Sequence, residues 1–262
     1  KNKAHRSNKA YRSLVFIVCF TLLSSWSYGQ TTNKDEYPDR PVKFVVPFAP
    51  GGPTDIIARI LSQKLTTLWG QAVVVDNRPG ASGNTGTTQV AKSKPDGYTI
   101  LLNTSSVAVN TSLFINPGYN LEKDFVGVAN VASTPNIFVA GASLQEKTLK
   151  EAIEGAKSGK YNYASPGEGT TPHLSAEYLF RVLAKVPVMH VPYKGAGPAV
   201  NAALTGEVQF ASVAVPAASQ LILGGQLRGL AVTSSKRLNS LPNVPTVAES
   251  GFTGFEDYTW VG

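Results

Sequence analysis

Residues 42–58 read VKFVVPFAPGGPTDIIA, a stretch that passes from an apolar run through a Gly/Pro-rich loop into a helical pattern. The run Val42–Val46 is short and rich in β-branched residues, which is typical of a buried strand in a parallel sheet. Pro53 suits the first turn of a helix, where its missing N–H group is not needed. The stretch therefore predicts a strand–loop–helix unit of an α/β fold, with a helix from Asp55 to Trp69. The apolar residues that we expect on one face of this helix are Ile56, Ile60, Leu61, Leu65 and Leu68.

The same order of apolar run and amphipathic stretch continues along the chain. Further helical patterns begin near Thr148, where Glu151 completes a capping-box signature, and at Pro172. Strands that alternate with helices predict parallel sheets covered by helices. No low-complexity linker interrupts the pattern, so we expect two hinged α/β lobes and not two tethered domains. The other predicted strands are Ala72–Asp76, Ile100–Asn103, Asn136–Ala140, Tyr161–Ala164, Met189–Val191, Val208–Ala211 and Gly229–Thr233.

The first 29 residues have the composition of an export signal. A basic leader without acidic residues precedes the apolar run Leu14–Leu23, and small residues stand at Ser27 and Gly29. This order predicts a secretory signal peptide, cleaved near Gly29-Gln30, and a periplasmic location. An uncleaved membrane anchor is the alternative, but a spanning helix needs about 20 apolar residues. The basic residues of the leader are Lys1, Lys3, Arg6, Lys9 and Arg12.

The net charge of the chain comes mostly from this leader. The whole sequence has 24 Lys and Arg against 17 Asp and Glu, a net charge of +7. Without the five basic residues of the leader, 19 basic and 17 acidic residues remain, a net charge of +2. No basic stripe is left that would suggest a nucleic-acid partner. Cys19, the one cysteine, lies in the apolar run, so the exported part has no residue for disulfides or thiolate metal sites.

Three Gly/Pro-rich loops each follow a predicted strand and open a helix. They are Pro47–Asp55, Ser165–His173 and Pro192–Ala199, named here loop 1, loop 2 and loop 3. The start of a helix presents free N–H groups and the positive end of its dipole, so such a loop can bind an anion. Tight turns are the alternative explanation for any one loop. Three loops of one form favour a site that binds a carboxylate through backbone N–H groups, without Arg or Lys.

The sequence lacks the usual signatures of an enzyme. It has neither a G-x-S-x-G nucleophile motif nor a phosphate-binding G-x-x-x-x-G-K-[ST] loop. Gly195–Gly197 begins a dinucleotide-binding pattern that lacks its third glycine. His173 and His190 have no cysteine partners and no ligand spacing, so we expect no catalytic residue, no metal and no cofactor. A hydrolase with His173 as its base stays open as a further hypothesis, although we expect His173 to form a hydrogen bond to ligand or backbone instead.

From Tyr37 onward the chain resembles the Bug-type receptors of tripartite tricarboxylate transporters. The strongest match is Tyr37-Pro38 with Arg40-Pro41, followed by a strand and then by Pro50–Asp55. The resemblance extends over essentially all of the sequence after the leader, and its motifs occur in the family's order. The further motifs are Val75–Ala81, Pro95–Thr99, Ser165–Gly167, Gly169-Thr170, Pro192–Gly195, Leu227–Val232 and Pro242–Glu249.

The resemblance implies a two-lobed, type II periplasmic-binding-protein fold that closes around its ligand. Each lobe would be a mainly parallel sheet flanked by helices. We expect the first part of lobe one in residues 30–135, lobe two in residues 136–234 and a return to lobe one in residues 235–262. Family members continue past the position of Gly262, so we expect the remainder of lobe one in a C-terminal segment outside this sequence.

The resemblance also implies a non-enzymatic receptor that captures a small organic carboxylate and delivers it to a membrane transporter. Its partners would be the large and small membrane subunits of that transporter, and we expect a monomer. A periplasmic sensor subunit with the same pocket is the alternative. By match to the family, the substrate-binding residues are Phe48, Gly51, Gly52, Asp55, Ser105, Ser165, Gly169, Thr170, Thr171, His173 and Tyr193.

One departure from the family lies in the segment from Gly206 to Leu223. Members often carry acidic residues where this chain has Gln209 and Val213. We therefore expect a less polar distal pocket, with the side chain at position 213 among those that choose the ligand.

Overall fold

The computed structural model describes residues 37–142 and 144–262. The chain divides into two units, Lys1–Asp39 and Arg40–Gly262, and the fold described below is that of the second unit. The predicted signal peptide and its cleavage position lie outside the described residues. No helix in the described part of the chain has the length and apolar character needed to cross a membrane.

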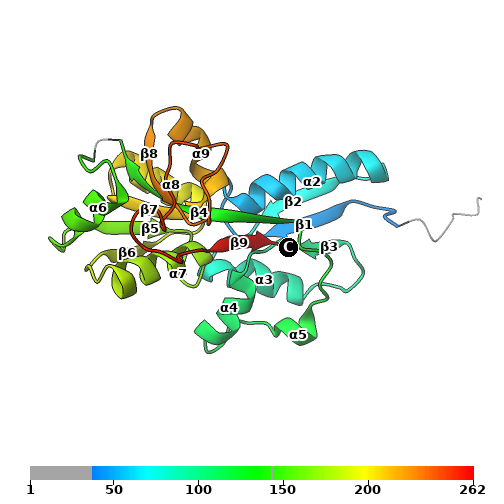
Figure 1. The fold of residues 1–262 in the computed structure, drawn as a ribbon. Helices are drawn as coiled ribbons and strands as arrows, with labels where there is room; N and C mark the ends of the chain where they lie inside the picture. Colours follow the sequence, from blue (N-terminus) through cyan, green and yellow to red (C-terminus); the bar gives the residue numbers. More distant parts are fainter. Residues whose placement is uncertain (1–36, 143) are drawn as a thin grey trace, which may run out of the picture. The chain divides into compact units, whose positions relative to one another are not determined.

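A three-stranded parallel sheet with the order β2-β1-β3 contains the first predicted strand as its centre. Figure 1 shows α2 on one side of this sheet and α3 on the other. The apolar face of α2 is shifted from the predicted one: Ile57, Leu61 and Leu65 pack on the sheet, whereas Ile60 and Leu68 are exposed. The elements are β1 (Val42–Val46), α2 (Pro53–Trp69), β2 (Val73–Asn77), η2 (Ala81–Gly83), α3 (Asn84–Ala91), β3 (Thr99–Leu101), α4 (Ser106–Leu113) and α5 (Leu121–Asp124).

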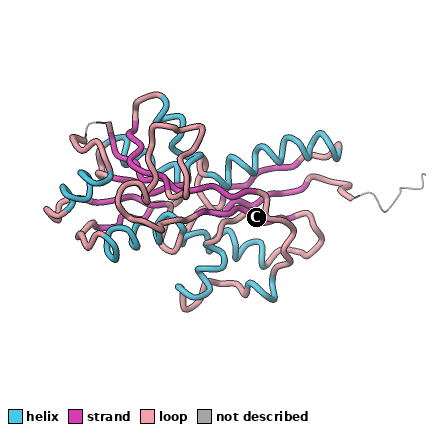
Figure 2. Tube along the Cα trace, viewed as in Figure 1, coloured by secondary structure: helices cyan, strands magenta, loops and turns pink. Residues whose placement is uncertain are grey.

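A second sheet has the order β6-β5-β7-β4-β8. Its strands β5, β6 and β7 run parallel, as predicted, whereas β4 runs antiparallel to its neighbours β7 and β8. Helices flank the strands of both sheets (Figure 2), which confirms the α/β class. The elements are β4 (Ala132–Gly141), α6 (Leu149–Ala156), β5 (Asn162–Ser165), α7 (Thr171–Glu177), the π-helix η3 (Tyr178–Leu183), β6 (Met189–Pro192), α8 (Ala196–Thr205), β7 (Phe210–Ala214), α9 (Val215–Leu223) and β8 (Leu227–Val232).

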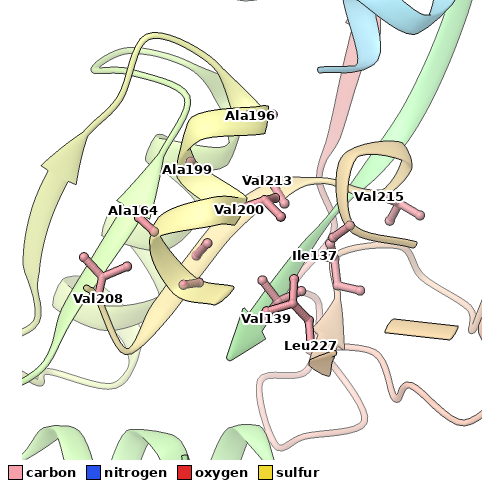
Figure 3. Packing of buried hydrophobic residues seen from close by; sticks show 14 of the residues in the cluster. Ile137, Val139, Ala164, Ala196, Ala199, Val200, Val208, Val213, Val215 and Leu227 are labelled. Atoms are coloured by element: carbon pink, nitrogen blue, oxygen red, sulfur yellow. The ribbon is translucent and has the colours of Figure 1, made fainter. Parts of the chain in front are cut away.

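The core of the second sheet lies on both of its faces. Side chains alternate between the faces along a strand, so Ile137 and Val139 of β4 enter one apolar cluster while Phe138 and Ala140 enter the other. Figure 3 shows the first cluster, in which β4, β7 and α8 pack together. Val213 lies in this cluster and is fully buried. Because both faces are covered, β4 has a continuous apolar run and not an alternating one.

The strand β4 joins the two sheets. Its first part, Ala132–Pro135, pairs with β9 (Tyr258–Val261), and its second part, Asn136–Gly141, pairs with β7 and β8. β9 in turn contacts the segment after β3, where Asn103 and Gly262 exchange backbone hydrogen bonds of 2.9 and 3.0 Å. Two antiparallel strands, named here the crossover strands, therefore connect the lobes. The sequence predicted β4 only from Asn136, because Pro135 and the polar residues before it mask the strand signal. It did not predict β9.

Candidate ligand-binding site

The three predicted loops follow the carboxyl ends of β1, β5 and β6, and two of them are in direct backbone contact. The N–H group of Ala49 in loop 1 donates to the carbonyl of Lys194 in loop 3 at 2.8 Å. A Cβ atom at Gly197 would lie 2.5 Å from the carbonyl oxygen of Pro50, so this approach requires glycine. The glycines of loop 3 thus allow the two lobes to meet at their loops.

A small cavity lies at this junction. Its wall includes the first residues of α2 and α8, Pro53 and Ala196, and the residues that precede α7 and α9, Thr170 and Ala214, so four helices start at one cavity. Among residues 37–142 and 144–262, no charged side chain lines it. The lining residues are Phe48, Gly52, Pro53, Thr54, Thr104, Pro166, Thr170, Pro172, Ala196, Ala214 and Thr259. We name it the anion cavity.

The electrostatics of the anion cavity come from backbone dipoles and hydroxyl groups. The first N–H groups of a helix have no partner within that helix, and the dipole places partial positive charge there. The hydroxyls of Thr170 and Thr259 already donate hydrogen bonds within the protein. Thr170 donates to Gly167 O at 2.7 Å and Thr259 to Asn136 Oδ1 at 2.8 Å. Thr54 is a buried residue of the wall, and its hydroxyl makes no hydrogen bond with residues 37–142 or 144–262. Thr54 is therefore a side-chain donor that a ligand could use.

A second, larger cavity shares Phe48 and Pro166 with the first. It is lined by η2 and by loops 2 and 3, and carries both signs of charge through Glu168 and Lys194. Ala81 and Ser82 in its wall have φ angles of 45° and 55°, in the left-handed region that non-glycine residues rarely adopt. Backbone strain of this kind is found at functional sites. We name it the outer cavity.

Asp55 stabilises loop 1 through the hydrogen bonds that its carboxylate accepts. Its carboxylate accepts hydrogen bonds from the Gly51 N–H at 3.1 Å, from Arg59 at 3.0 Å twice, and from Asn77 at 3.0 Å. Burial raises the pKa of Asp55, but the Arg59, Gly51 and Asn77 hydrogen bonds outweigh this and hold it below its usual value. Asp55 lines neither cavity and is already saturated with donors.

Loop 2 is held by two histidines, His173 at its own end and His190 on β6, whose rings are tilted by 35°. The ring centroids of His173 and His190 lie 4.2 Å apart. The Gly169 N–H donates to His173 Nδ1 at 3.1 Å, and Ser165 Oγ lies 2.7 Å from His190 Nε2. Burial lowers the pKa of both rings, that of His190 to about 4 with a further contribution from His173. Both histidines are therefore neutral at pH 7, and they hold loop 2 by hydrogen bonds.

Loop 2 also contacts α4 in the other lobe. The hydroxyls of Ser105 and Thr171 are hydrogen-bonded to each other. Asn110 donates to Ser82 O at 3.0 Å and to Asn84 Oδ1 at 2.7 Å, which ties α4 to the loop around η2. These contacts connect the walls of the two cavities.

Comparison with known proteins assigns the family. A family model described as "Tripartite tricarboxylate transporter family receptor" matches residues 57–262. The chain belongs to this receptor family. A relative, Protein BugT of Bordetella pertussis, is 41% identical over 230 residues, which are 86% of this chain and 70% of BugT.

Solved structures support the fold of the receptor. A protein from R. palustris solved with adipate has a TM-score of 0.82 and 36% identity, covering 86% of this chain and 76% of that one. MatC from Rhodopseudomonas palustris with bound malate has a TM-score of 0.81 and 32% identity, covering 86% and 78%. The periplasmic binding protein BugD has a TM-score of 0.82 and 40% identity, covering 86% and 76%. The expected two-lobed periplasmic-binding-protein fold is confirmed.

The structure separates the predicted site residues of the receptor into two groups. Phe48, Gly52 and Thr170 line the anion cavity, and Phe48 and Tyr193 line the outer cavity. The Tyr193 hydroxyl donates to Glu207 at 2.8 Å, and Glu207 does not line the outer cavity. The others line neither cavity and instead hold the loops, through the contacts described above: Gly51, Asp55, Ser105, Ser165, Gly169, Thr171 and His173.

The expectation for Val213 is wrong. Its side chain lies in the core of lobe two and lines neither cavity, because β7 presents that position to α8 and β4. Gln209 is likewise absent from both linings and accepts a hydrogen bond from the Asn162 N–H at 2.9 Å. Ala214, the residue after Val213, lines the anion cavity instead.

Sequence reasoning missed several residues of the receptor's cavities. Ala214 precedes the start of α9, and Pro216 near that start gave the same signal as the prolines of loops 1 to 3. The loop around η2 begins in the family motif Val75–Ala81, but the sequence did not predict it as part of the site. Thr54 and Ala196 lie within predicted loops and were not named. Thr104 and Thr259 carried no local signal, because long-range pairing places them there.

Proposed function

We propose that this chain is an extracytoplasmic receptor that captures a small organic carboxylate and delivers it to a tripartite tricarboxylate transporter. The observation that carries the proposal is the convergence of four helix starts on a cavity to which the described part of the chain contributes no charged side chain. Dipoles of this kind favour an anion, and a carboxylate can accept several N–H groups at once. The role is binding without conversion of the ligand, in the periplasm, with the large and small membrane subunits as partners.

The ligand class that fits best is a flexible acid with a second polar end. One carboxylate would occupy the anion cavity, and the remainder would extend past Phe48 toward the outer cavity. Lys194 and Glu168 border that cavity and can discriminate the remote group by its charge. Relatives solved with adipate and with malate support a dicarboxylate. Residues 30–135 would form the first part of lobe one and residues 136–234 lobe two. Leu241, Val244, Val247 and Phe255 pack in the apolar clusters of lobe two, so the chain would return to lobe one only at β9 and not from residue 235 as predicted.

A thermal-shift screen of the full-length exported protein, refolded to remove bound ligand, tests the proposal. Adipate and malate are the first probes, with adipamide and malamide as matched controls that lack the charge. A ligand at a hundred times its dissociation constant stabilises the native state by about 2.7 kcal/mol. We expect an acid to raise the melting temperature and its amide not to. Equal shifts with acid and amide would contradict recognition through an anion cavity.

A further inference from the structure

The crossover strands β4 and β9 separate at Asn136. Up to Pro135, β4 pairs with β9, and from Asn136 onward it pairs with β7 and β8. A strand that changes partners leaves backbone and side-chain groups to be satisfied at the branch point. At this point, named here the fork, the structure places a cluster of buried polar side chains.

Asp257 is the centre of this cluster. Its Oδ2 accepts a hydrogen bond of 2.8 Å from Asn136 Nδ2 and another from the Ser175 hydroxyl. Thr233 Oγ1 donates to the carbonyl of Asp257 at 2.6 Å and accepts the Asn136 N–H at 2.8 Å. The side chains around the carboxylate are almost fully buried, Asn136 at 0%, Thr233 at 0% and Ser175 at 5% exposure. The cluster thus ties β4, β8, α7 and β9 together at one place.

The carboxylate of Asp257 forms no ion pair with the described part of the chain. A half-buried carboxylate without a cation costs stability, so neutral residues would hold the fold as well or better. Burial raises the pKa of Asp257, and the Ser175 and Asn136 hydrogen bonds offset this in part. An acid at this place therefore calls for a reason other than stability.

The cluster reaches the ligand site in two directions. Thr259, in the wall of the anion cavity, donates to Asn136 Oδ1 at 2.8 Å. Ser175 Oγ lies 2.9 Å from the carbonyl of Thr171, at the first turn of α7. The hydroxyl of Thr171 is in turn bonded to Ser105 of the other lobe. Asp257 is therefore linked through hydrogen bonds to two parts of the site, although it lines neither cavity.

We propose that Asp257 is a positioning residue for ligand capture. By holding Asn136 and Ser175 it sets the angle at which the crossover strands separate. That angle determines where Thr259 and the start of α7 stand in the anion cavity. This inference rests on the proposed function for its effect on affinity, whereas its effect on the geometry of the fork stands by itself.

The first test measures the distance between the lobes. Spin labels are attached at Gln63→Cys and Lys150→Cys, two exposed positions on α2 and α6, in the full-length exported protein, from which Cys19 is removed with the predicted signal peptide. We expect Asp257→Ala to broaden the distance distribution, and Asn136→Ala to do the same. Combining Asn136→Asp with Asp257→Asn exchanges the carboxylate and the amide, and should restore the narrow distribution. Glu256→Gln, at the exposed neighbour, is the matched control and should change nothing.

The second test measures the affinity for adipate and malate by calorimetry. Asp257→Ala should weaken binding of whichever acid binds by about tenfold, the effect of roughly one charge-assisted hydrogen bond. The exchanged pair should recover most of this loss. A lower melting temperature with unchanged distances and affinity would assign Asp257 a purely structural role and overturn the inference. If neither acid binds but Asp257→Ala still broadens the distances, the proposed function fails and the geometric role stands.

Discussion

The rings of His173 and His190 are tilted by 35° with their centroids 4.2 Å apart, and each ring forms one hydrogen bond to loop 2: His190 to Ser165 at its start and His173 to Gly169 in its middle. His173 accepts the Gly169 N–H, so it must carry a lone pair on Nδ1. Protonating both rings would place two positive charges in contact in a half-buried site. Glu177, Glu168 and Arg181 are the other charged groups near the pair, with contributions of both signs.

The paired histidines predict a loss of stability in mild acid. Burial depresses the pKa of His190 from 6.5 to about 4, so the unfolded chain binds more protons than the native protein between these values. The free energy of unfolding should therefore fall as the pH decreases through this window, by about 1–2 kcal/mol after solvent screening. Melting temperatures of wild type and His190→Gln from pH 7.5 to 4 check this. A slope in the variant as steep as in wild type would contradict the assignment.

Gly52 should be required for ligand binding but not for folding. It lines the anion cavity, and a Cβ at this position would lie 3.6 Å from the Ala196 Cβ, an ordinary contact. Gly52→Ala should therefore fold and retain part of its affinity. Gly52→Leu would fill the space for the carboxylate and should abolish binding of adipate or malate in calorimetry, with a circular dichroism spectrum like that of wild type. Normal binding by Gly52→Leu would place the carboxylate elsewhere.

The Thr54 hydroxyl should contribute directly to affinity. It is buried in the cavity wall and makes no hydrogen bond within the described residues, so it can donate to an anion. Thr54→Val keeps the shape and removes the donor, which should weaken binding by about tenfold, while the melting temperature without ligand changes little. Thr54→Ser keeps the hydroxyl and is the matched control. Equal affinities for the Val and Ser variants would exclude Thr54 as a ligand contact.

Gly197 should hold loops 1 and 3 together. A Cβ would lie 2.5 Å from the Pro50 carbonyl, which belongs to the backbone and can yield only if the loops separate. Gly197→Ala should cost about 1–3 kcal/mol in the free energy of unfolding or hold the lobes apart. Denaturant titration and small-angle scattering distinguish these results. Gly127→Ala, where no atom lies within 4 Å, is the control and should behave as wild type.

Local signals account for much of the fold. β1 was predicted with its observed bounds, and α2 was predicted two residues short at its start, because a β-branched run and a Pro-opened helix are short-range patterns. Thr148 caps α6 as expected: its side chain accepts the Glu151 N–H at 3.2 Å. The same reasoning failed at β9, whose four residues become a strand through pairing with β4. Pairing partners far apart in the sequence leave no trace in periodicity.

For this receptor, the sequence by itself determined most of the strands and which loops open helices, and it predicted that those loops bind an anion through their N–H groups. The tertiary structure alone decided which of these loops share a cavity. It placed Ala214 and Thr259 in the wall of the anion cavity and Val213 in the core of lobe two. Asp55 and His173 stabilise the loops through hydrogen bonds and do not line a cavity. The physical reason is that helix starts are local features, whereas their convergence depends on how the crossover strands join two sheets.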